Sequence, residues 1–245
     1  MNTKNNEIKY VDNLTADEKR WLSTKPFGNF NYQESLIRIR DFSYIIELLS
    51  LQNSKSLSLL DLGCGPGWTS IMLAKLGLDV TAVDISKDMI SIAKANAQKD
   101  HLKVTFEVDD IEEVNFRNKF DRVLLYDALH HCPNELKVIK NAYEALKPGG
   151  IILVIEPNKR HGYDKSAQKT ATRFGVLEKG YSPHYLKKEM RKTGFKNIVR
   201  YDCDYRVNKA AKEGVKSFLK QSIRFILARL IWSHYSFQVW LKAEK

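Results

Sequence analysis

Short apolar runs and amphipathic stretches alternate along the central part of this chain. Five runs have the length and composition of buried strands: Leu57–Leu62, Val80–Val83, Val104–Val108, Arg122–Tyr126 and Ile151–Ile155. Between them, helical spacing and capping residues predict helices over residues 69–75, 86–97 and 134–146. Strands that alternate with helices of this length predict right-handed crossovers, and therefore an α/β fold with a doubly wound, mostly parallel sheet.

The pattern continues on both sides of this centre. Residues 33–51 carry apolar side chains at helical spacing and predict an amphipathic helix. The run Pro148-Gly149-Gly150 is expected to stop the helix over 134–146. A capped helix and two more strands are predicted towards the end of the chain, at Ser182–Gly194, Asn197–Tyr201 and Phe237–Leu241.

Three parts of the chain follow from these elements. We expect an N-terminal helical cap over residues 1–55 and an α/β core over residues 56–205 together with 234–245. Between these two parts of the core, residues 206–233 predict a basic amphipathic helical insertion. Its cationic stripe consists of Lys209, Lys212, Lys216, Lys220 and Arg224.

Composition narrows the class of protein. The chain has 245 residues, of which 43% are hydrophobic and 28% charged, and this balance excludes wholesale disorder. Three cysteines lie far apart without a C-x-x-C pair, which argues against a disulfide framework or a zinc cluster. No apolar run approaches the roughly 20 residues of a membrane span, and the N-terminus has no apolar signal core. We therefore expect a soluble, cytoplasmic protein without a transmembrane segment.

The net charge of +11 is unevenly distributed. Residues 1–156 hold 19 Lys and Arg against 22 Asp and Glu, a net charge of −3, whereas residues 157–245 hold 21 against 7, a net charge of +14. This asymmetry is compatible with an anionic partner of the C-terminal part: a nucleic acid, a phosphorylated metabolite or an anionic lipid surface. For the basic stripe over 207–231, the alternatives are peripheral membrane contact and simple packing on the core.

A glycine-rich turn follows the first strand, in the sequence LLDLGCGPGW over residues 59–68. Glycines at such a position let the backbone turn tightly and approach a ligand at the carboxyl edge of the sheet. The dinucleotide pattern G-x-G-x-x-G fails because Trp68 stands where its third glycine is required, and no Walker lysine follows. The turn therefore predicts a nucleoside-binding site that is neither a pyrophosphate cradle nor an ATPase loop.

Acidic residues close the next two strands. Asp84 ends the second strand, 21 residues after Gly63, where a carboxylate can accept both ribose hydroxyls of an adenosine-containing ligand. Asp109 ends the third strand and can accept the exocyclic amine of adenine, while Ile85 and Ile111 offer apolar faces to the ring. Three acids, Asp61 included, at successive strands around one glycine turn favour a ligand site over ordinary loop residues.

The ordered set of motifs resembles the class I S-adenosylmethionine-dependent methyltransferases. The resemblance covers residues 35–205 and the last strand, and rests on LLDLGCGPGWTS (59–70), VTAVDISKDMI (80–90), FEVDDIEEV (106–114), FDRVLLYDALHH (120–131) and LKPGGIILVIEPN (146–158). It implies a Rossmann-like, seven-stranded sheet with an antiparallel last strand, and S-adenosyl-L-methionine as the cofactor. The residues that the resemblance assigns to the methionine end of the cofactor are Asp61, Gly63 and Gly65. Cys64 and Met89 are further candidate contacts of the cofactor.

The same resemblance assigns the rest of the cofactor site. Asp84 would hold the ribose, and Asp109 with Asp110 or Ile111 the adenine. Tyr126 would form the floor near the sulfonium. The family shares this site without a universal catalytic residue, because the sulfonium already activates the methyl group.

The stretch after the fourth strand holds the candidate catalytic residues. A base is needed only if the acceptor arrives protonated, and an imidazole titrates near neutral pH, so His131 or His130 is the candidate. The alternative is that one histidine caps the following helix and the other packs under the cofactor. We expect no metal site, because adjacent histidines point in different directions and no third ligand stands at a suitable spacing.

These observations favour a methyltransferase that acts on an oxygen or nitrogen of a small-molecule acceptor, with an anionic acceptor fitting the positive charge. The alternatives are an RNA methyltransferase that uses the basic C-terminal region and a catalytically silent cofactor-binding protein. No appended RNA-binding module is visible, which argues against the first. The N-terminal aromatics and the segment Lys159–Lys179, with Tyr163 and Phe174, are expected to close over the acceptor.

Overall fold

The computed structural model describes residues 3–27, 32–51, 57–201 and 238–245. Its helices are α1 (Thr3–Ile8), α2 (Ala16–Thr24), α3 (Tyr32–Leu48), α4 (Trp68–Lys75), α5 (Lys87–Lys99), α6 (Glu135–Ala145), α7 (Lys165–Phe174) and α8 (Pro183–Thr193). Short 3-10 turns are η1 (Val11–Asn13), η2 (Leu129–His131) and η3 (His161–Tyr163). The strands are β1 (Ser58–Leu62), β2 (Asp79–Asp84), β3 (Thr105–Val108), β4 (Phe120–Tyr126), β5 (Leu146–Pro157), β6 (Lys196–Tyr201) and β7 (Gln238–Glu244).

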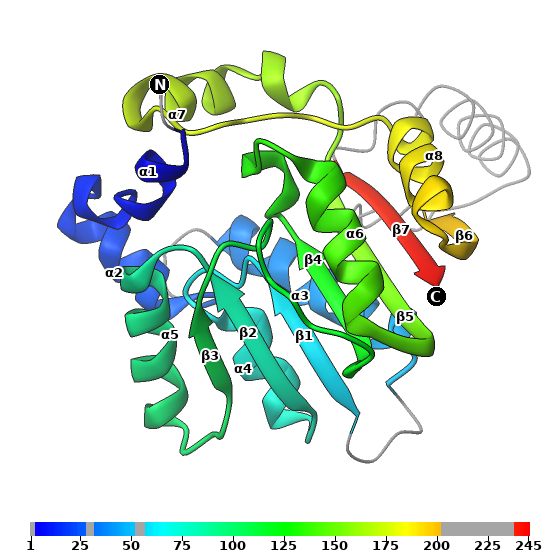
Figure 1. The fold of residues 1–245 in the computed structure, drawn as a ribbon. Helices are drawn as coiled ribbons and strands as arrows, with labels where there is room; N and C mark the ends of the chain where they lie inside the picture. The colour runs from blue at the N-terminus through cyan, green and yellow to red at the C-terminus, as the bar shows by residue number, and fades with distance from the viewer. Residues whose placement is uncertain (1–2, 28–31, 52–56, 202–237) are drawn as a thin grey trace, which may run out of the picture.

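The seven strands form one sheet in the order β3-β2-β1-β4-β5-β7-β6 (Figure 1). All neighbours pair in parallel except β7, which is antiparallel to both β5 and β6. The strand order reverses between β1 and β4, so the crevice at their carboxyl ends is the topological switch point where α/β sheets bind ligands. The α/β, doubly wound fold and the antiparallel last strand are thus confirmed.

Two hydrophobic layers cover the sheet because successive side chains of a strand point to opposite faces. On β1, Leu60 and Leu62 pack with α6 and α8, whereas Leu59 packs with α3, α4 and α5. On β4, Val123 and Leu125 join the first layer, and Leu124 joins the second. Every one of these leucines and valines is fully buried, which fixes the register of the strands that carry the site.

Helix caps follow the sequence signals. The Ser86 hydroxyl accepts the backbone N–H of Met89 at the start of α5, and the Ser182 hydroxyl accepts that of Tyr185 at the start of α8. Gly194 ends α8 in the left-handed region, with φ of 118°. The predicted bounds of these helices therefore hold to within about two residues.

Two segments differ from the sequence-based expectations. Helix α6 ends at Ala145, but Pro148-Gly149-Gly150 does not form a separate stop, since β5 begins at Leu146 and includes it. The register of β5 against β4 shifts between Phe120 and Arg122, and this irregularity accommodates the extra residues. Residues 165–174, expected within a loop, form α7, because Asp164 caps its N-terminus and Gly175 its C-terminus.

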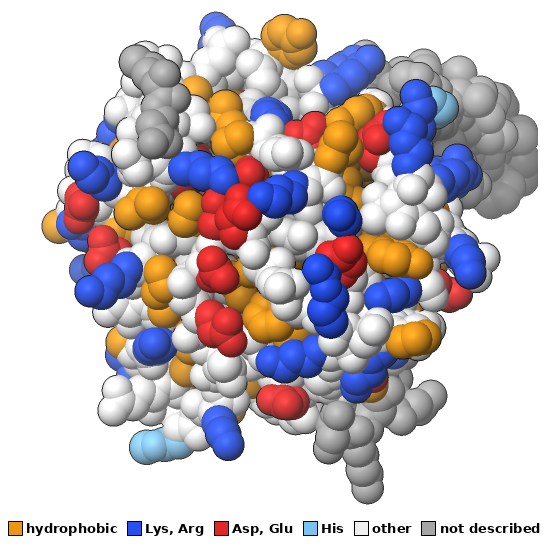
Figure 2. Space-filling model, in the orientation of Figure 1, with side chains coloured by type: hydrophobic (Ala, Val, Ile, Leu, Met, Phe, Trp, Pro, Cys, Tyr) orange, Lys and Arg blue, Asp and Glu red, His pale blue; other side chains and the backbone are white. Residues whose placement is uncertain are grey.

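Helices α1, α2 and α7 lie together at the end of the sheet towards which the parallel strands point (Figure 1). The predicted insertion over 206–233 lies outside the described residues, so the interpretations that depend on it stay predictions. On the face shown in Figure 2, basic side chains are dispersed among acidic ones. Among the described residues, no helix combines the length and the apolarity that crossing a bilayer requires.

Candidate active site

A cavity of about 640 Å³ opens at the carboxyl ends of β1, β2 and β4. Its walls come from the loops after these strands and after β3, and its roof from α1, α2, α3 and the η3–α7 region. The residues that we singled out from the sequence and that line the cavity are Gly63, Gly65, Asp84, Ile85, Met89, Asp110, Ile111, His130 and His131. Residues far apart in sequence therefore converge on one site.

The glycine turn forms one end of the cavity. Gly63 has a φ of 75°, and a Cβ atom placed on it would lie 2.4 Å from the Cβ atom of Ala128. Gly65 has a φ of 53°, and a Cβ atom there would meet no heavy atom within 4 Å. The first glycine thus permits close packing of two loops, and the second leaves open space beside the backbone for a ligand.

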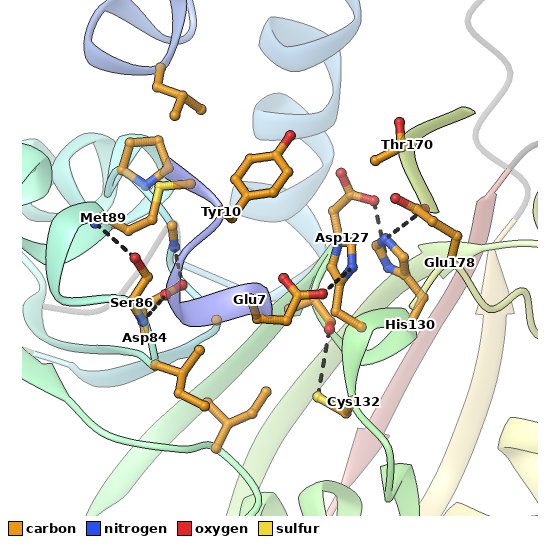
Figure 3. A pocket seen from close by; sticks show the side chains of 18 of the residues that line it. Glu7, Tyr10, Asp84, Ser86, Met89, Asp127, His130, Cys132, Thr170 and Glu178 are labelled. Atoms are coloured by element: carbon orange, nitrogen blue, oxygen red, sulfur yellow. Dashed lines mark hydrogen bonds and ion pairs between the residues drawn. The ribbon is translucent and has the colours of Figure 1, made fainter. Parts of the chain in front are cut away.

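Asp84 faces the same space (Figure 3). Its Oδ2 atom accepts the backbone N–H of Gly65 at 2.8 Å, and its Oδ1 atom accepts that of Ser86 at 2.9 Å. Burial raises the pKa of Asp84 to about 6, although the two backbone N–H groups oppose this shift. Each carboxylate oxygen retains acceptor capacity, so the side chain can receive two hydroxyl donors from the cavity.

At the end of β3, Asp110 and not Asp109 lines the cavity. Asp109 is exposed and accepts the backbone N–H of Asp110, which makes it a turn-forming residue. The ammonium group of Lys4, from α1, lies 2.6 Å from the Asp110 carboxylate and 2.8 Å from that of Glu112. The predicted adenine contact of Asp109 is therefore not supported by its position, and Asp110 is the better candidate.

Asp61 and Tyr126 are also turned away from the cavity. Asp61 is buried and accepts the hydroxyl groups of Thr69 at 2.7 Å and Ser70 at 2.6 Å, which ties α4 to β1. Tyr126 donates its hydroxyl to Asp41 at 2.6 Å. Both residues occupy strand positions that face the layer of α3 and α4, so the structure gives Tyr126 a core position instead of the expected floor near the sulfonium.

Cys64 likewise does not line the cavity and packs in the same layer, where burial raises the pKa of its thiol well above the usual range. A buried thiol with a raised pKa is a poor nucleophile. The structure thus gives Cys64 a packing position in the loop. Its expected contact with the cofactor is not supported.

His130 is held by a residue that the sequence analysis missed. Its Nδ1 atom lies 2.8 Å from Oε2 of Glu156, a fully buried side chain of β5. Glu156 also accepts the backbone N–H groups of Ala128 at 3.0 Å and Leu129 at 2.8 Å. The sequence did hold a signal for Glu156, which is the one acid within the apolar strand IILVIEP. A buried carboxylate requires hydrogen-bond partners, so its position indicated a structured polar contact.

His131 has different surroundings. Its Nδ1 atom lies 2.8 Å from the carbonyl oxygen of Leu177 and 3.2 Å from Oε1 of Glu7, which α1 carries. Burial lowers the pKa of His131, but Glu7 and the nearby Glu178 and Asp127 raise it by more, to about 9. His131 therefore contacts the roof of the cavity, whereas His130 is anchored to the sheet.

The roof is held together by contacts between α1, α2 and α7. The rings of Tyr10 and Phe174 lie 4.7 Å apart, and the Asn6 amide donates to the carbonyl of Gly175 at 2.9 Å. Arg173 of α7 forms a bidentate pair with Glu18 of α2. Of the aromatic residues expected to close over the acceptor, Trp21 lines the cavity and Phe174 packs within this roof. Phe27 and Tyr163 are exposed instead, and Phe30 lies outside the described residues.

Two cations, Lys25 and Arg38, line the cavity beside Trp21 of α2. The Lys25 ammonium group sits 3.9 Å from the ring centroid of Trp21, and the Arg38 guanidinium lies 5.1 Å from the same ring. Burial and the neighbouring Arg38 lower the pKa of Lys25 to about 7. Asp127, with a φ of 55°, lies nearby and lines the same cavity. No sequence signal marked this pair of cations.

Residues 59–150 match a protein family described as a methyltransferase domain. Ubiquinone biosynthesis O-methyltransferase of Rickettsia typhi is 32% identical over 156 residues, which covers 63% of this chain and 60% of that protein. The enzyme of the same name from Pelagibacter ubique is 35% identical over 140 residues, 55% of this chain and 57% of that protein. The chain thus matches less than two thirds of the length of these curated relatives.

Solved structures share the fold. Magnesium protoporphyrin IX methyltransferase from Synechocystis with bound S-adenosylmethionine has a TM-score of 0.66 at 19% identity, covering 100% of this chain and 98% of that one. Phosphoethanolamine N-methyltransferase 2 of Haemonchus contortus, also with S-adenosylmethionine, has a TM-score of 0.65 at 22% identity, covering 92% of this chain and 55% of that one. At these identities the likeness concerns the fold.

Proposed function

We propose that this chain, which belongs to the class I S-adenosylmethionine-dependent methyltransferases, transfers the methyl group of S-adenosylmethionine to an oxygen or nitrogen of a small-molecule acceptor. When bound, this cofactor supplies an electrophilic methyl group on a sulfonium. The chain itself must hold the nucleoside, align the acceptor and take up a proton.

The described cysteines Cys64 and Cys132 are free thiols, which supports a cytoplasmic location.

One observation carries the proposal: a single cavity joins Asp84 and Gly65 at one end to His131 at the other. The cofactor fits the first end. The carboxylate of Asp84 has acceptor capacity for both ribose hydroxyls, and the open space beside Gly65 admits a ligand against the backbone. Ile85, Met89 and Ile111 add apolar surface where the adenine would lie.

His131 is the residue that we propose as the base. The hydrogen bond from its Nδ1 to the carbonyl of Leu177 selects the tautomer with a lone pair on Nε2. When Glu7 of α1 withdraws from the ring, the neutral imidazole can take the proton of an acceptor hydroxyl group during attack, or that of an ammonium group before attack. The acceptor atom would then bond to the methyl carbon as the carbon–sulfur bond breaks and its electron pair returns to the sulfur, which leaves as a neutral thioether. We propose that α1 and α2 form a cap together with α7 and exclude water from this step, whereas α3 packs on the sheet and belongs to the core.

The acceptor end favours an anionic group. Lys25 and Arg38 both line the cavity, and the Nε atom of Arg38 is buried without a hydrogen-bond partner among the described residues. A carboxylate or phosphate on the acceptor would supply that partner and hold Lys25 in its charged form. Trp21 lies beside both cations and offers an apolar face. We therefore propose a small acceptor that combines an anionic group with an apolar body.

The test uses the full chain and methyl-labelled S-adenosylmethionine. Calorimetry measures binding of the cofactor, and incubation with a fraction of small metabolites, followed by mass spectrometry, identifies a labelled product. We expect His131→Asn to abolish label transfer while cofactor affinity stays within twofold of wild type, and Lys25→Met to raise the KM of an anionic acceptor at least tenfold. His184→Asn, on an exposed position of α8, is the matched control.

Two results would overturn the proposal. If the chain binds no S-adenosylmethionine at millimolar concentrations, the cofactor site is wrong. If it binds the cofactor tightly but labels no acceptor in any fraction, a silent cofactor-binding protein is the correct interpretation. Full activity in His131→Asn would remove this residue from the proton transfer.

A further inference from the structure

Three side chains meet at the acceptor end of the cavity from three separate segments. His130 comes from η2, His161 from η3, and Glu178 from the segment after α7. The Nε2 atom of His161 lies 2.6 Å from Oε2 of Glu178, and that of His130 lies 3.8 Å from the same oxygen. One ligand atom from each residue lies within 4.8 Å of the others. This convergence was not expected, because the sequence showed only the adjacent pair His130 and His131.

The orientation of the His130 ring is fixed by Glu156, on the side of the ring away from His161 and Glu178. Its Nδ1 atom is held at 2.8 Å by Glu156, so its Nε2 atom is the one presented to His161 and Glu178. Glu156 cannot rotate freely, because backbone N–H groups of the η2 turn also bind it. A histidine whose second nitrogen is bound to a carboxylate is the arrangement that orients metal ligands in proteins.

The distances suit a small divalent cation. A tetrahedral site with bonds of about 2.0–2.2 Å places its ligand atoms about 3.3–3.6 Å apart, so the observed separations need to change by no more than about 1.5 Å. The present contact of His161 with Glu178 is a hydrogen bond that the cation would replace. His130, at 3.8 Å, is beyond hydrogen-bond distance of Glu178 and has room for an ion between the two atoms.

We propose that His130, His161 and Glu178 bind one divalent cation of the zinc class, with a coordination position open to the cavity. Two imidazoles and one carboxylate are ligands of catalytic zinc sites, which leave their fourth position to water or substrate. All three residues line the cavity, and Figure 3 shows the side chains of His130 and Glu178 directed towards each other, with Thr170 beside them.

This site refines the proposed methyl transfer and rests on it for its chemical role. A cation beside His131 would polarise an acceptor hydroxyl group and lower the pKa of that hydroxyl, so that its proton passes more readily to the imidazole. The rings of His130 and His131 lie 3.9 Å apart, which places cation and base side by side. The acceptor class then narrows to hydroxyl compounds, because an oxygen bound to the ion keeps a lone pair for attack on the methyl group, whereas an amine nitrogen bound to the ion has used its only lone pair.

A second group of acids among the described residues is a poorer candidate for a metal site. Asp110, Glu112 and Glu113 also lie close together, but the ammonium group of Lys4 already occupies the first two at 2.6 and 2.8 Å. This group contains no histidine, and nothing orients its carboxylates from behind as Glu156 orients His130. It serves as an internal control for non-specific cation binding.

The experiment measures metal binding without cofactor or acceptor. The full chain is treated with chelator and titrated with ZnCl₂ by calorimetry, and with Co²⁺ by visible absorption. We expect one ion per chain and Co²⁺ bands typical of nitrogen ligands in four-coordinate geometry. His161→Ala and Glu178→Gln should each weaken Zn²⁺ binding at least tenfold, and Glu156→Gln should weaken it about 10- to 100-fold.

His184→Ala and Glu113→Gln are the controls and should leave Zn²⁺ binding unchanged. Thermal melts without metal show whether each variant folds, and His161→Ala is the safest, since His161 is partly exposed at the cavity rim. Failure to bind a stoichiometric ion, or equal binding by wild type, His161→Ala and Glu178→Gln, would overturn the site.

Binding of S-adenosylmethionine, measured separately after chelation, tells this failure apart from a failure of the proposed function. Retained cofactor binding and methyl transfer in a chain that takes up no Zn²⁺ would refute the metal site alone. Stoichiometric Zn²⁺ binding in a chain that binds no S-adenosylmethionine would support the site and refute the methyltransferase.

Discussion

Replacement of Asp84 by alanine tests the cofactor site most directly. Its two oxygens are positioned by the N–H groups of Gly65 and Ser86 at 2.8 and 2.9 Å and keep lone pairs for two hydroxyl donors from the cavity. Hydrogen bonds to a charged acceptor contribute about 1.5–3 kcal/mol net. At about 1.4 kcal/mol per tenfold, we expect Asp84→Ala to weaken binding of S-adenosylmethionine roughly 10- to 150-fold in calorimetry.

The pH dependence of binding gives a second measurement on the wild-type chain. Burial raises the pKa of Asp84 from 3.8 to about 6. Protonation of Asp84 therefore stabilises the folded, cofactor-free chain at low pH, and this stabilisation is lost as the pH rises through 6. Ribose hydroxyls prefer the ionised form, so cofactor affinity should be constant above pH 7 and fall roughly tenfold by pH 5.

Asp109→Ala is the matched control, because Asp109 ends the neighbouring strand but is exposed and does not line the cavity. We expect its cofactor affinity to equal that of wild type. Asp84→Asn retains one acceptor oxygen for the loop and guards against a folding defect in Asp84→Ala. Unchanged affinity in a folded Asp84→Ala chain, or an affinity independent of pH from 7 to 5, would refute the reasoning.

Three further predictions concern stability. Tyr126→Phe removes the hydrogen-bond donor to buried Asp41, so the free energy of unfolding in urea should fall by about 1–3 kcal/mol. Cofactor affinity should stay unchanged, and a loss of affinity without a loss of stability would show that Tyr126 contacts the cofactor. Gly63→Ala places a Cβ atom 2.4 Å from that of Ala128 at a φ of 75°, so the melting temperature should fall, and an unchanged one would show that the loops part freely. Burial raises the pKa of Asp121, but hydrogen bonds from Ser58 and Lys147 lower it by more, to about 2. The ionised side chain therefore stabilises the folded chain above pH 4, and this stabilisation is lost towards pH 2. The difference in urea stability between wild type and Asp121→Asn should shrink from pH 5 to pH 3, and a constant difference would contradict this.

Local sequence signals were sufficient to bring together the residues of the proposed cofactor half of the cavity. A strand that runs into a glycine turn, and an acid that ends the next strand, place Gly63, Gly65 and Asp84 at the same edge of a parallel sheet, whatever surrounds them. The assignments that the resemblance made for Asp61 and Tyr126 did not match the cavity. Both lie on the face of the sheet that α3 and α4 cover, and the hydrogen bonds that hold them there come from other elements.

The sequence by itself determined the order of the strands, the helices between them except α7, the glycine turn and the position of Asp84 at the end of β2, because hydrophobic periodicity, caps and glycines act over a few residues. Only the tertiary structure brought Glu156 behind His130, and Glu7, His161 and Glu178 around the acceptor end. Lys4 reaches Asp110 across 106 positions of the chain. Such contacts depend on how the covering helices pack over the sheet, and no short-range pattern encodes that packing.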